Sequence, residues 1–135
     1  MLQTATEKSN DRETIQEILN DIVESFNNLE LERLLSYHSD DIILMDQGMP
    51  LVQGKTKVRE MFAAFKKKGV KIKLSYDIHE IELENKLAFV RGTVYRTIYA
   101  TENAAAQKDT HRFVCLFKKL DTGWLRTHVM ANSAS

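Results

Sequence analysis

One carboxylate in this sequence stands where it could transfer protons. Asp46 follows the apolar residues 42–45 and precedes a turn at residues 48–50, so it ends a short predicted strand. A carboxylate in such a place can meet a substrate proton with little competing water, and burial moves its pKa toward a useful range. An aspartate before a turn also commonly binds its own backbone. Asp46 is therefore either the general base of a pocket or the cap of this turn.

The other groups that could do chemistry are four histidines and one cysteine. The histidines are His38, His79, His111 and His128, and their spacing does not suggest a metal site. His128 alternates with Met130 on the last predicted strand, where it is either a proton shuttle in a pocket wall or an ordinary sheet histidine. His111 starts a strand and is expected at the rim of the sheet. Cys115 lies in an apolar run, which favours a small buried side chain over a nucleophile.

The composition narrows the class of protein. A chain of 135 residues corresponds to one domain. Nineteen basic residues balance nineteen acidic ones, which argues against nucleic acid and anionic membranes as partners. A single cysteine allows no internal disulfide, and neither a leader nor a run of about 20 apolar residues is visible. We therefore expect a cytoplasmic protein.

The first half of the sequence predicts three helices that must position these groups. Residues 1–10 are polar and are expected to form a flexible tail, followed by a capping box of Asn10 and Glu13. Apolar residues then recur at helical spacing: Ile15, Ile18, Leu19, Ile22, Val23 and Phe26. A short second helix covers residues 31–35, and Asp40–Asp41 closes the helical region. A third helix follows Gly54 and ends at Gly69, with its three final lysines in solvent.

The second half of the sequence predicts strands. Residues 70–78 alternate between apolar and polar, whereas residues 87–99 and 113–117 are apolar on both faces. On the long strand, Leu87, Phe89 and Tyr95 share one face, and Ala88, Val90, Val94 and Ile98 share the other. Three helices cannot cover both faces of a sheet, so we expect a homodimer through the open face. The alternative is a strongly curled sheet that buries part of its own outer face.

The order of these motifs resembles the nuclear transport factor 2-like superfamily, and most closely its SnoaL-like branch, whose members are mostly of unknown function. The resemblance is carried by Asp40–Asp41, residues 48–50 with Gly54, residues 87–93 and residues 123–133. It implies an α+β fold in which a cone-like, curved antiparallel sheet of four to six strands wraps over three N-terminal helices. It also implies a single domain over residues 11–133.

The resemblance extends to the site. In ketosteroid isomerase, a member of the superfamily, the general base falls on Asp46, but Ile22 stands at the tyrosine position and Cys115 near the aspartic acid position of the oxyanion site. Steroid isomerisation is therefore not expected. The expected catalytic residues are Asp46 and His128. The expected pocket residues are Ile22, Phe26, Phe62, Phe65, Tyr95, Cys115 and Met130.

Two classes of function stay open for such a pocket. One is a cofactor-independent isomerase, dehydratase or cyclase that acts on a small apolar carbonyl or hydroxyl compound by general acid–base chemistry. The alternative is a non-catalytic module that binds a small ligand or assembles copies of the chain, with a pocket that is open or filled by its own side chains. The expected partners are a second copy and a small apolar ligand, with no metal or cofactor.

Overall fold

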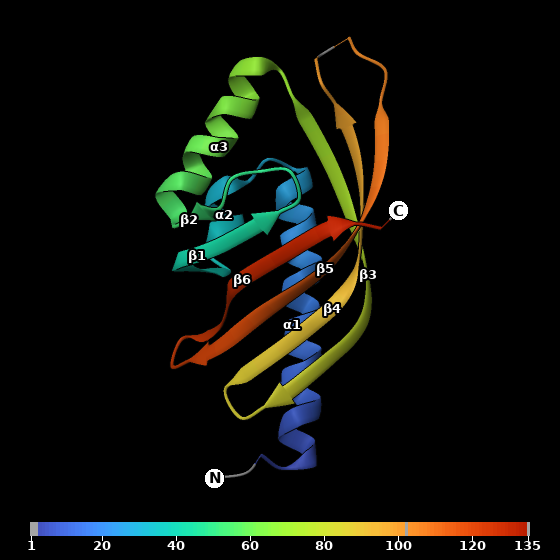
Figure 1. Cartoon of the computed structure of the whole chain (residues 1–135). Helices are drawn as coiled ribbons and strands as arrows, with labels where there is room; N and C mark the ends of the chain where they lie inside the picture. The colour runs from blue at the N-terminus through green and yellow to red at the C-terminus, as the bar shows by residue number, and fades with distance from the viewer. Residues whose placement is uncertain (1–2, 102, 135) are drawn as a thin grey trace.

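The computed structural model describes residues 3–101 and 103–134, which form three helices and six strands in one α+β unit (Figure 1). In chain order the elements are α1 (Ala5–Asn27), α2 (Leu31–Leu35), β1 (His38–Asp46), β2 (Val52–Gln53), α3 (Lys55–Lys68), β3 (Lys71–Glu84), β4 (Leu87–Tyr99), β5 (Gln107–Leu120) and β6 (Gly123–Ser133). The strands form one open sheet in the order β2-β1-β6-β5-β4-β3. The three helices thus accompany a single six-stranded sheet.

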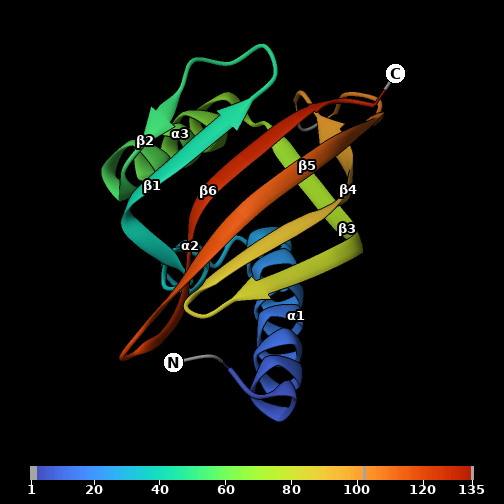
Figure 2. The ribbon, with the colours of Figure 1, turned by 60° about the horizontal axis from the view of Figure 1, so that its bottom comes forward.

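The predicted cone-like fold is confirmed, with one correction to the strand directions. Every neighbouring pair is antiparallel except β1 and β6, which run parallel, so the sheet is mixed. A parallel pair needs a long crossover, and the chain between β1 and β6 supplies one because it contains α3 and four strands. Register shifts in the β3–β4 and β5–β6 pairs increase the twist, and the sheet curls over α1 (Figure 2).

The first helix begins before the predicted cap. α1 starts at Ala5, and the Thr4 side-chain oxygen accepts a hydrogen bond of 3.1 Å from the Glu7 backbone N–H. Asn10 lies inside the helix, where its carbonyl accepts from the Thr14 hydroxyl at 3.0 Å. This corrects the expected start of the helix, because Thr4 and Glu7 provide a polar start one turn and a half earlier. Residues 1 and 2 of the expected tail lie outside the described residues.

The position of the Asp40–Asp41 pair also needs correction. The sequence predicts that the pair closes a helix, but both residues lie in β1, which begins at His38. The preceding helix ends at Leu35, and the chain then pairs at once with the last strand, since the Arg126 N–H donates to the Tyr37 carbonyl at 2.8 Å. β1 is therefore long enough to carry His38 at one end and Asp46 at the other.

The third helix agrees with the prediction. α3 ends at Lys68 and is capped by Gly69, whose φ of 73° places it in the left-handed region that glycine adopts without strain. The three lysines before it are exposed, and their charges face the negative end of the helix dipole. This run of cations is therefore explained by the helix end alone.

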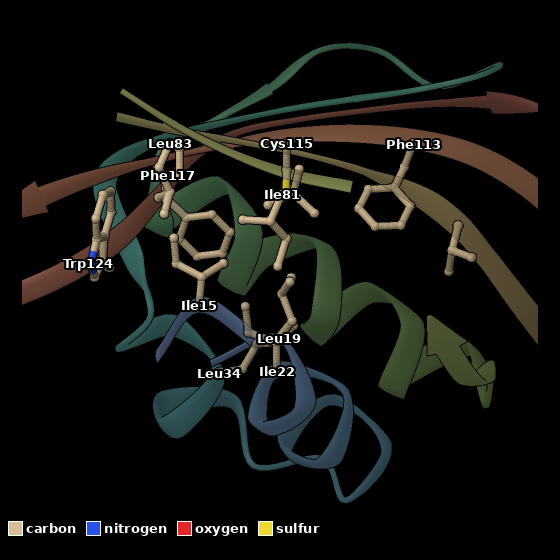
Figure 3. Close-up of a cluster of buried hydrophobic side chains, with 13 residues drawn as sticks. Ile15, Leu19, Ile22, Leu34, Ile81, Leu83, Phe113, Cys115, Phe117 and Trp124 are labelled. Carbon is tan, nitrogen blue, oxygen red and sulfur yellow. The ribbon is translucent and has the colours of Figure 1, made fainter. Parts of the chain in front are cut away.

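The core lies between α1 and the inner face of the sheet. Figure 3 shows Ile15, Leu19 and Ile22 of α1 directed at Ile81, Cys115 and Phe117. These side chains are almost wholly buried, and truncating one of the aliphatic residues to alanine is expected to cost about 3 kcal/mol. The helical spacing of apolar residues therefore identified the buried face of α1 correctly.

The two faces of the central strands also separate as predicted. On β4, Ala88, Val90 and Val94 are buried against the helices, whereas Leu87 and Tyr95 are exposed on the outer face. Among the described residues, no helix has both the length and the hydropathy needed to cross a membrane. The inner face of the sheet thus holds the core.

Candidate functional site

Asp46 lies in the wall of a cavity of about 170 Å³ on the inner side of the sheet. The cavity is bounded by α1, α3 and all six strands, so it occupies the wide end of the cone. Most of the lining is apolar. The polar side chains in the lining are those of Asp46, Tyr76, Arg96 and His111. A mostly apolar hollow with a few convergent polar groups is the usual form of a small-molecule site.

Three of these side chains join Asp109 in what we call the mouth cluster (Asp46, Arg96, Asp109 and His111). Arg96 and Asp109 stand opposite each other on β4 and β5, and two N–H groups of Arg96 donate to the two carboxylate oxygens of Asp109 at 2.9 and 2.8 Å. A third N–H group of Arg96 donates to Asp46 Oδ2 at 3.2 Å. Arg96 therefore links the end of β1 to the middle of the sheet.

The hydrogen bonds of Arg96 set the charge state of this cluster. They hold the pKa of Asp109 below its usual value, with burial acting in the opposite sense. The same contact with Asp109 raises the pKa of Arg96. Asp109 is thus a carboxylate and Arg96 a cation, and the pair forms a fixed support beside Asp46.

His111 completes the cluster and has a defined tautomer. Arg96 Nη2 lies 3.2 Å from His111 Nε2, and since a guanidinium can only donate, Nε2 must accept. In the neutral ring the proton is then on Nδ1, which lies 3.2 Å from Asp46 Oδ1. Within the described residues this buried Nδ1 has no aligned hydrogen-bond partner. Its N–H is therefore available beside a carboxylate in the cavity wall.

Asp46 makes both of the contacts that its sequence position allows. Its Oδ1 accepts from the backbone N–H of Gln47 at 2.9 Å, and its carbonyl accepts from the N–H of Met49 at 3.2 Å, so it does cap the turn. Its carboxylate also lines the cavity beside His111 and Arg96. The two alternatives for Asp46 are compatible in this structure.

A second cavity, of about 110 Å³, adjoins the first and contains a second group of polar side chains. We call this group the inner cluster (His38, Tyr76 and Arg126). Arg126 Nε donates to His38 Nε2 at 3.0 Å, and Arg126 Nη1 donates to the Tyr76 hydroxyl at 3.2 Å. The two cavities share part of their lining, including Tyr76. Polar groups therefore reach the interior of the cone at two separate places.

Aromatic side chains divide the interior. Phe26 lines both cavities and also a third hollow of about 410 Å³ between the corner of α1 and α2, α3 and the start of β3. Its ring packs edge-on against Phe62 with centroids 5.5 Å apart, and Phe62 packs against Phe65 at 6.3 Å. These three rings are the partition between the hollows, and their positions limit the size of any ligand.

The structure brings some of the predicted site residues together. Phe26 and Phe65 line the first cavity with Asp46, and Ile22, Phe26 and Phe62 line the second. Cys115 is buried in the core, where burial raises the pKa of its thiol despite a hydrogen bond from Arg126. Of the predicted site residues, Asp46, Ile22 and the three phenylalanines therefore line the interior cavities.

Three other predicted residues lie elsewhere. Tyr95 and Met130 are exposed on the outer face of the sheet, and His128 shares that face, with its Nδ1 2.8 Å from the Thr127 hydroxyl. None of the three lines a cavity described above. For His128 and Met130 the register shift between β5 and β6 is the physical reason, because one extra residue turns the side chain of Arg126 inward and that of His128 outward. Tyr95 points outward because it shares the parity of the exposed Leu87 on β4.

Sequence reasoning missed Tyr76, Arg96 and Arg126, and it placed His111 at the rim although its side chain is buried. A signal was present for Arg96, because it shares the inward-facing parity of Val94 and Ile98 on β4. The described part of the chain has no group of three or more histidine, cysteine or carboxylate side chains that could hold a metal ion.

The fold and the cavity define a class of protein. The structure is similar to a ketosteroid isomerase-like protein from Erwinia carotovora atroseptica, with a TM-score of 0.77 and 22% identity over 90% of this chain and 94% of that chain. It is also similar to a nuclear transport factor 2-like superfamily protein from Salmonella enterica serovar Typhimurium (TM-score 0.82, 18% identity, 95% and 94% covered). A candidate dehydratase of the nuclear transport factor 2-like family from Streptomyces avermitilis is similar too, with a TM-score of 0.79 and 15% identity over 93% of this chain and 97% of that chain.

These similarities establish the nuclear transport factor 2-like fold. A sequence model of the SnoaL-like domain matches residues 19–123, which is more than half of the chain. The chain therefore belongs to the SnoaL-like domain family, as its motifs indicate. Curated proteins gave no match.

Proposed function

We propose that this protein catalyses cofactor-independent acid–base chemistry on a small apolar carbonyl or hydroxyl compound, as an isomerase, dehydratase or cyclase. The observation that supports this proposal is the Asp46–His111 pair, with Oδ1 and Nδ1 3.2 Å apart in the wall of an apolar cavity. Paired groups of this kind can take a proton from one substrate atom and give one to another. No metal or organic cofactor is needed for such a step.

In the proposed reaction Asp46 is the base and His111 the acid. The Asp46 carboxylate removes a proton from the carbon beside a carbonyl, and the electrons of the broken carbon–hydrogen bond form a carbon–carbon double bond. His111 donates its Nδ1 proton to the departing hydroxyl, which leaves as water in a dehydration, or to the carbonyl oxygen in an isomerisation. In the dehydration the protonated Asp46 then returns a proton to Nδ1, which lies 3.2 Å from its Oδ1. In the isomerisation Asp46 protonates another carbon of the substrate, and the substrate oxygen returns its proton to His111. Arg96 is a positioning residue, because its contacts with Nε2 of His111 and Oδ2 of Asp46 fix both groups.

The cavity sets the size of the proposed substrate. Its volume of about 170 Å³ is close to that of an engineered cavity of about 150 Å³ that holds benzene, and well below the range for drug-sized ligands. A substrate with one ring fits, with Phe26 and Phe65 as its apolar contacts. We assign the role of acid to His111 rather than to His128, because His128 lies on the opposite face of the sheet.

The test is a reaction with single-ring probes. The dehydration of 3-hydroxycyclohexanone can be followed by enone absorbance, and deuterium uptake beside the carbonyl of cyclohexanone by proton NMR. Asp46→Asn is expected to lower either rate by about a hundredfold or more. His128→Gln, a histidine change on the outer face, is the matched control and is expected to leave the rate unchanged. Equal rates in the wild type and Asp46→Asn would remove the catalytic proposal.

A specific observation also favours assembly of two copies. Leu87, Tyr95, Leu116 and Met130 are exposed on the outer face of β4, β5 and β6, away from the core. We infer that this face mediates a homodimer, since exposed apolar groups on a two-sided sheet require a cover. Light scattering is expected to give twice the chain mass of 15.6 kDa. Leu116→Glu is expected to halve the measured mass, whereas a wild-type monomer contradicts the inference.

A further inference from the structure

The side chain of Arg126 carries a charge inside the protein. The residue is 6% exposed, and its guanidinium faces the second cavity together with His38 and Tyr76. A guanidinium stays protonated and has five N–H donors to satisfy. Moving such a charge away from water is costly unless an anion accompanies it. The partners of Arg126 therefore decide what this charge does.

All of the partners in the structure are uncharged at neutral pH. Nε donates to His38 Nε2, Nη1 donates to the Tyr76 hydroxyl, and the remaining side-chain contact is with the thiol of Cys115. Over residues 3–101 and 103–134, no carboxylate forms an ion pair with Arg126. The other interior arginine, Arg96, contacts two carboxylates. The charge of Arg126 is thus uncompensated within the described chain.

His38 is held in the neutral form that this arrangement needs. Its Nδ1 lies 2.8 Å from the Leu34 carbonyl, which can only accept, so the proton of the neutral ring is on Nδ1. Burial and, to a lesser degree, the charge of Arg126 lower the pKa of His38 to about 3. Its Nε2 lone pair then accepts from Arg126. His38 fixes the guanidinium in place and contributes no negative charge.

We propose that the second cavity binds a short-chain carboxylate, with Arg126 as its ionic contact and Tyr76 and His38 as the groups that orient Arg126. Apart from these three residues the cavity is lined by aliphatic and aromatic side chains and methionine, such as Ile22, Leu34 and Phe62. An anion with an apolar body fits this lining better than a fully hydrated inorganic ion, because its carbon chain replaces water against apolar walls.

The cavity volume limits the length of that body. At about 110 Å³ the cavity is smaller than the cavity of about 150 Å³ that holds benzene, so we expect a ligand of about five non-hydrogen atoms. Propionate has this size, and propionamide is its uncharged counterpart. The proposal does not depend on proton transfer at the mouth cluster, since Arg126 does not line the first cavity.

The experiment is an NMR titration of the whole, nitrogen-15-labelled protein at neutral pH and constant ionic strength. Propionate is expected to shift the Nε–H signal of Arg126 in a saturable way at millimolar concentration. Propionamide is expected to bind at least about tenfold more weakly, because it has no negative charge to pair with the Arg126 guanidinium. Equal binding of the two probes, displacement of propionate by an equal concentration of chloride, or no saturable shift overturns the proposal.

Variants extend the test to the residue itself. Arg126→Gln keeps hydrogen-bonding capacity and removes the charge, so it is expected to bind propionate and propionamide equally. Arg91→Gln is the matched control, because Arg91 is exposed and pairs with Glu80 on the outer face. Retention of the preference for propionate in Arg126→Gln overturns the proposal. If Arg126→Gln does not fold, the comparison of the two probes on the wild type still decides.

Discussion

The mouth cluster and the inner cluster occupy adjoining cavities, yet they treat charge in opposite ways. In the mouth cluster the cation of Arg96 lies between the carboxylates of Asp46 and Asp109, and both carboxylates are partly exposed. In the inner cluster the cation of Arg126 is buried among neutral groups. One region pairs its cation with carboxylates at the edge of solvent, and the other keeps a cation without an anion in the interior.

This difference indicates different roles for two similar residues. A partly exposed carboxylate beside the imidazole of a cavity wall can exchange protons with a substrate, which suits acid–base chemistry. A fixed buried cation cannot give up its proton, so it suits the binding of an anion. Arginine on the inner face of this sheet is therefore a support for reactive groups in one place and a candidate ligand contact in the other.

A third buried charge shows how the same chain treats a purely structural ion. Asp11 of α1 accepts hydrogen bonds from Lys119 at 3.0 Å and from the Trp124 indole N–H at 3.2 Å, and these attach the helix to β5 and β6. Burial alone would raise the pKa of Asp11, but these partners outweigh it and the pKa lies below its usual value. The buried charge of Asp11, which attaches the helix to the sheet, thus has a partner of opposite charge in Lys119. Arg126 departs from that pattern.

The largest expected effect comes from removing the cation of the mouth cluster. Arg96→Met removes both hydrogen bonds to the Asp109 carboxylate and the one to Asp46 Oδ2, and we expect the free energy of unfolding to fall by about 2 kcal/mol. Urea unfolding measures the change. Arg91→Met is the control, since an exposed pair such as Arg91–Glu80 contributes about 0.5 kcal/mol. If both variants lose the same amount, the mouth cluster is no better organised than a surface ion pair.

Much of this architecture could be predicted from residue patterns, for a local reason. The helical spacing from Ile15 to Phe26 and the alternation on β4 depend on neighbouring residues only, and burial confirms both. The left-handed end of α3 is likewise encoded in one glycine, Gly69. These features need no knowledge of which strands pair.

The polar clusters could not be predicted in the same way, because they depend on pairing between distant segments. The Arg96–Asp109 contact depends on the β4–β5 register across a loop, and the Asp46–His111 contact joins two strands that are not neighbours in the sheet. Alternation alone also does not say which set of residues faces inward. On β6 the extra residue near Thr127 breaks the alternation, so Arg126 rather than His128 reaches the interior.

The next effect concerns pH and tests the neutral state of His38. In the folded protein the pKa of this ring is about 3, whereas in the unfolded chain it has the ordinary histidine pKa of 6.5. Between these values the unfolded state binds more protons, so the free energy of unfolding falls as the pH falls. We expect a loss of about 1.5 kcal/mol between about pH 6.5 and 5.

A variant assigns this loss to the inner cluster. His38→Gln has no titrating ring, so its unfolding free energy is expected to change much less over the same range, measured by urea unfolding at each pH. His128→Gln is the control and is expected to keep the wild-type slope, since His128 lies outside the cluster. The window stays above the range in which the carboxylates with lowered pKa values, such as Asp11 and Asp109, begin to matter. A wild-type slope in His38→Gln contradicts a neutral His38.

The smallest expected effect separates the two clusters at the residue that their cavities share. Tyr76→Phe removes the hydroxyl that accepts from Arg126 Nη1 but keeps the ring against Phe113, whose centroid lies 4.8 Å away. We expect a loss of about 1 kcal/mol in unfolding free energy. Propionate is expected to restore part of the loss, because an anion gives Arg126 the acceptor that Tyr76 supplied.

The turnover of a single-ring ketone by Tyr76→Phe is expected to stay at the wild-type level. In the described chain no hydrogen bond joins the Tyr76 hydroxyl to Asp46, His111 or Arg96. If the turnover falls as much as the propionate affinity does, the two cavities act as one site and the division drawn between them is wrong.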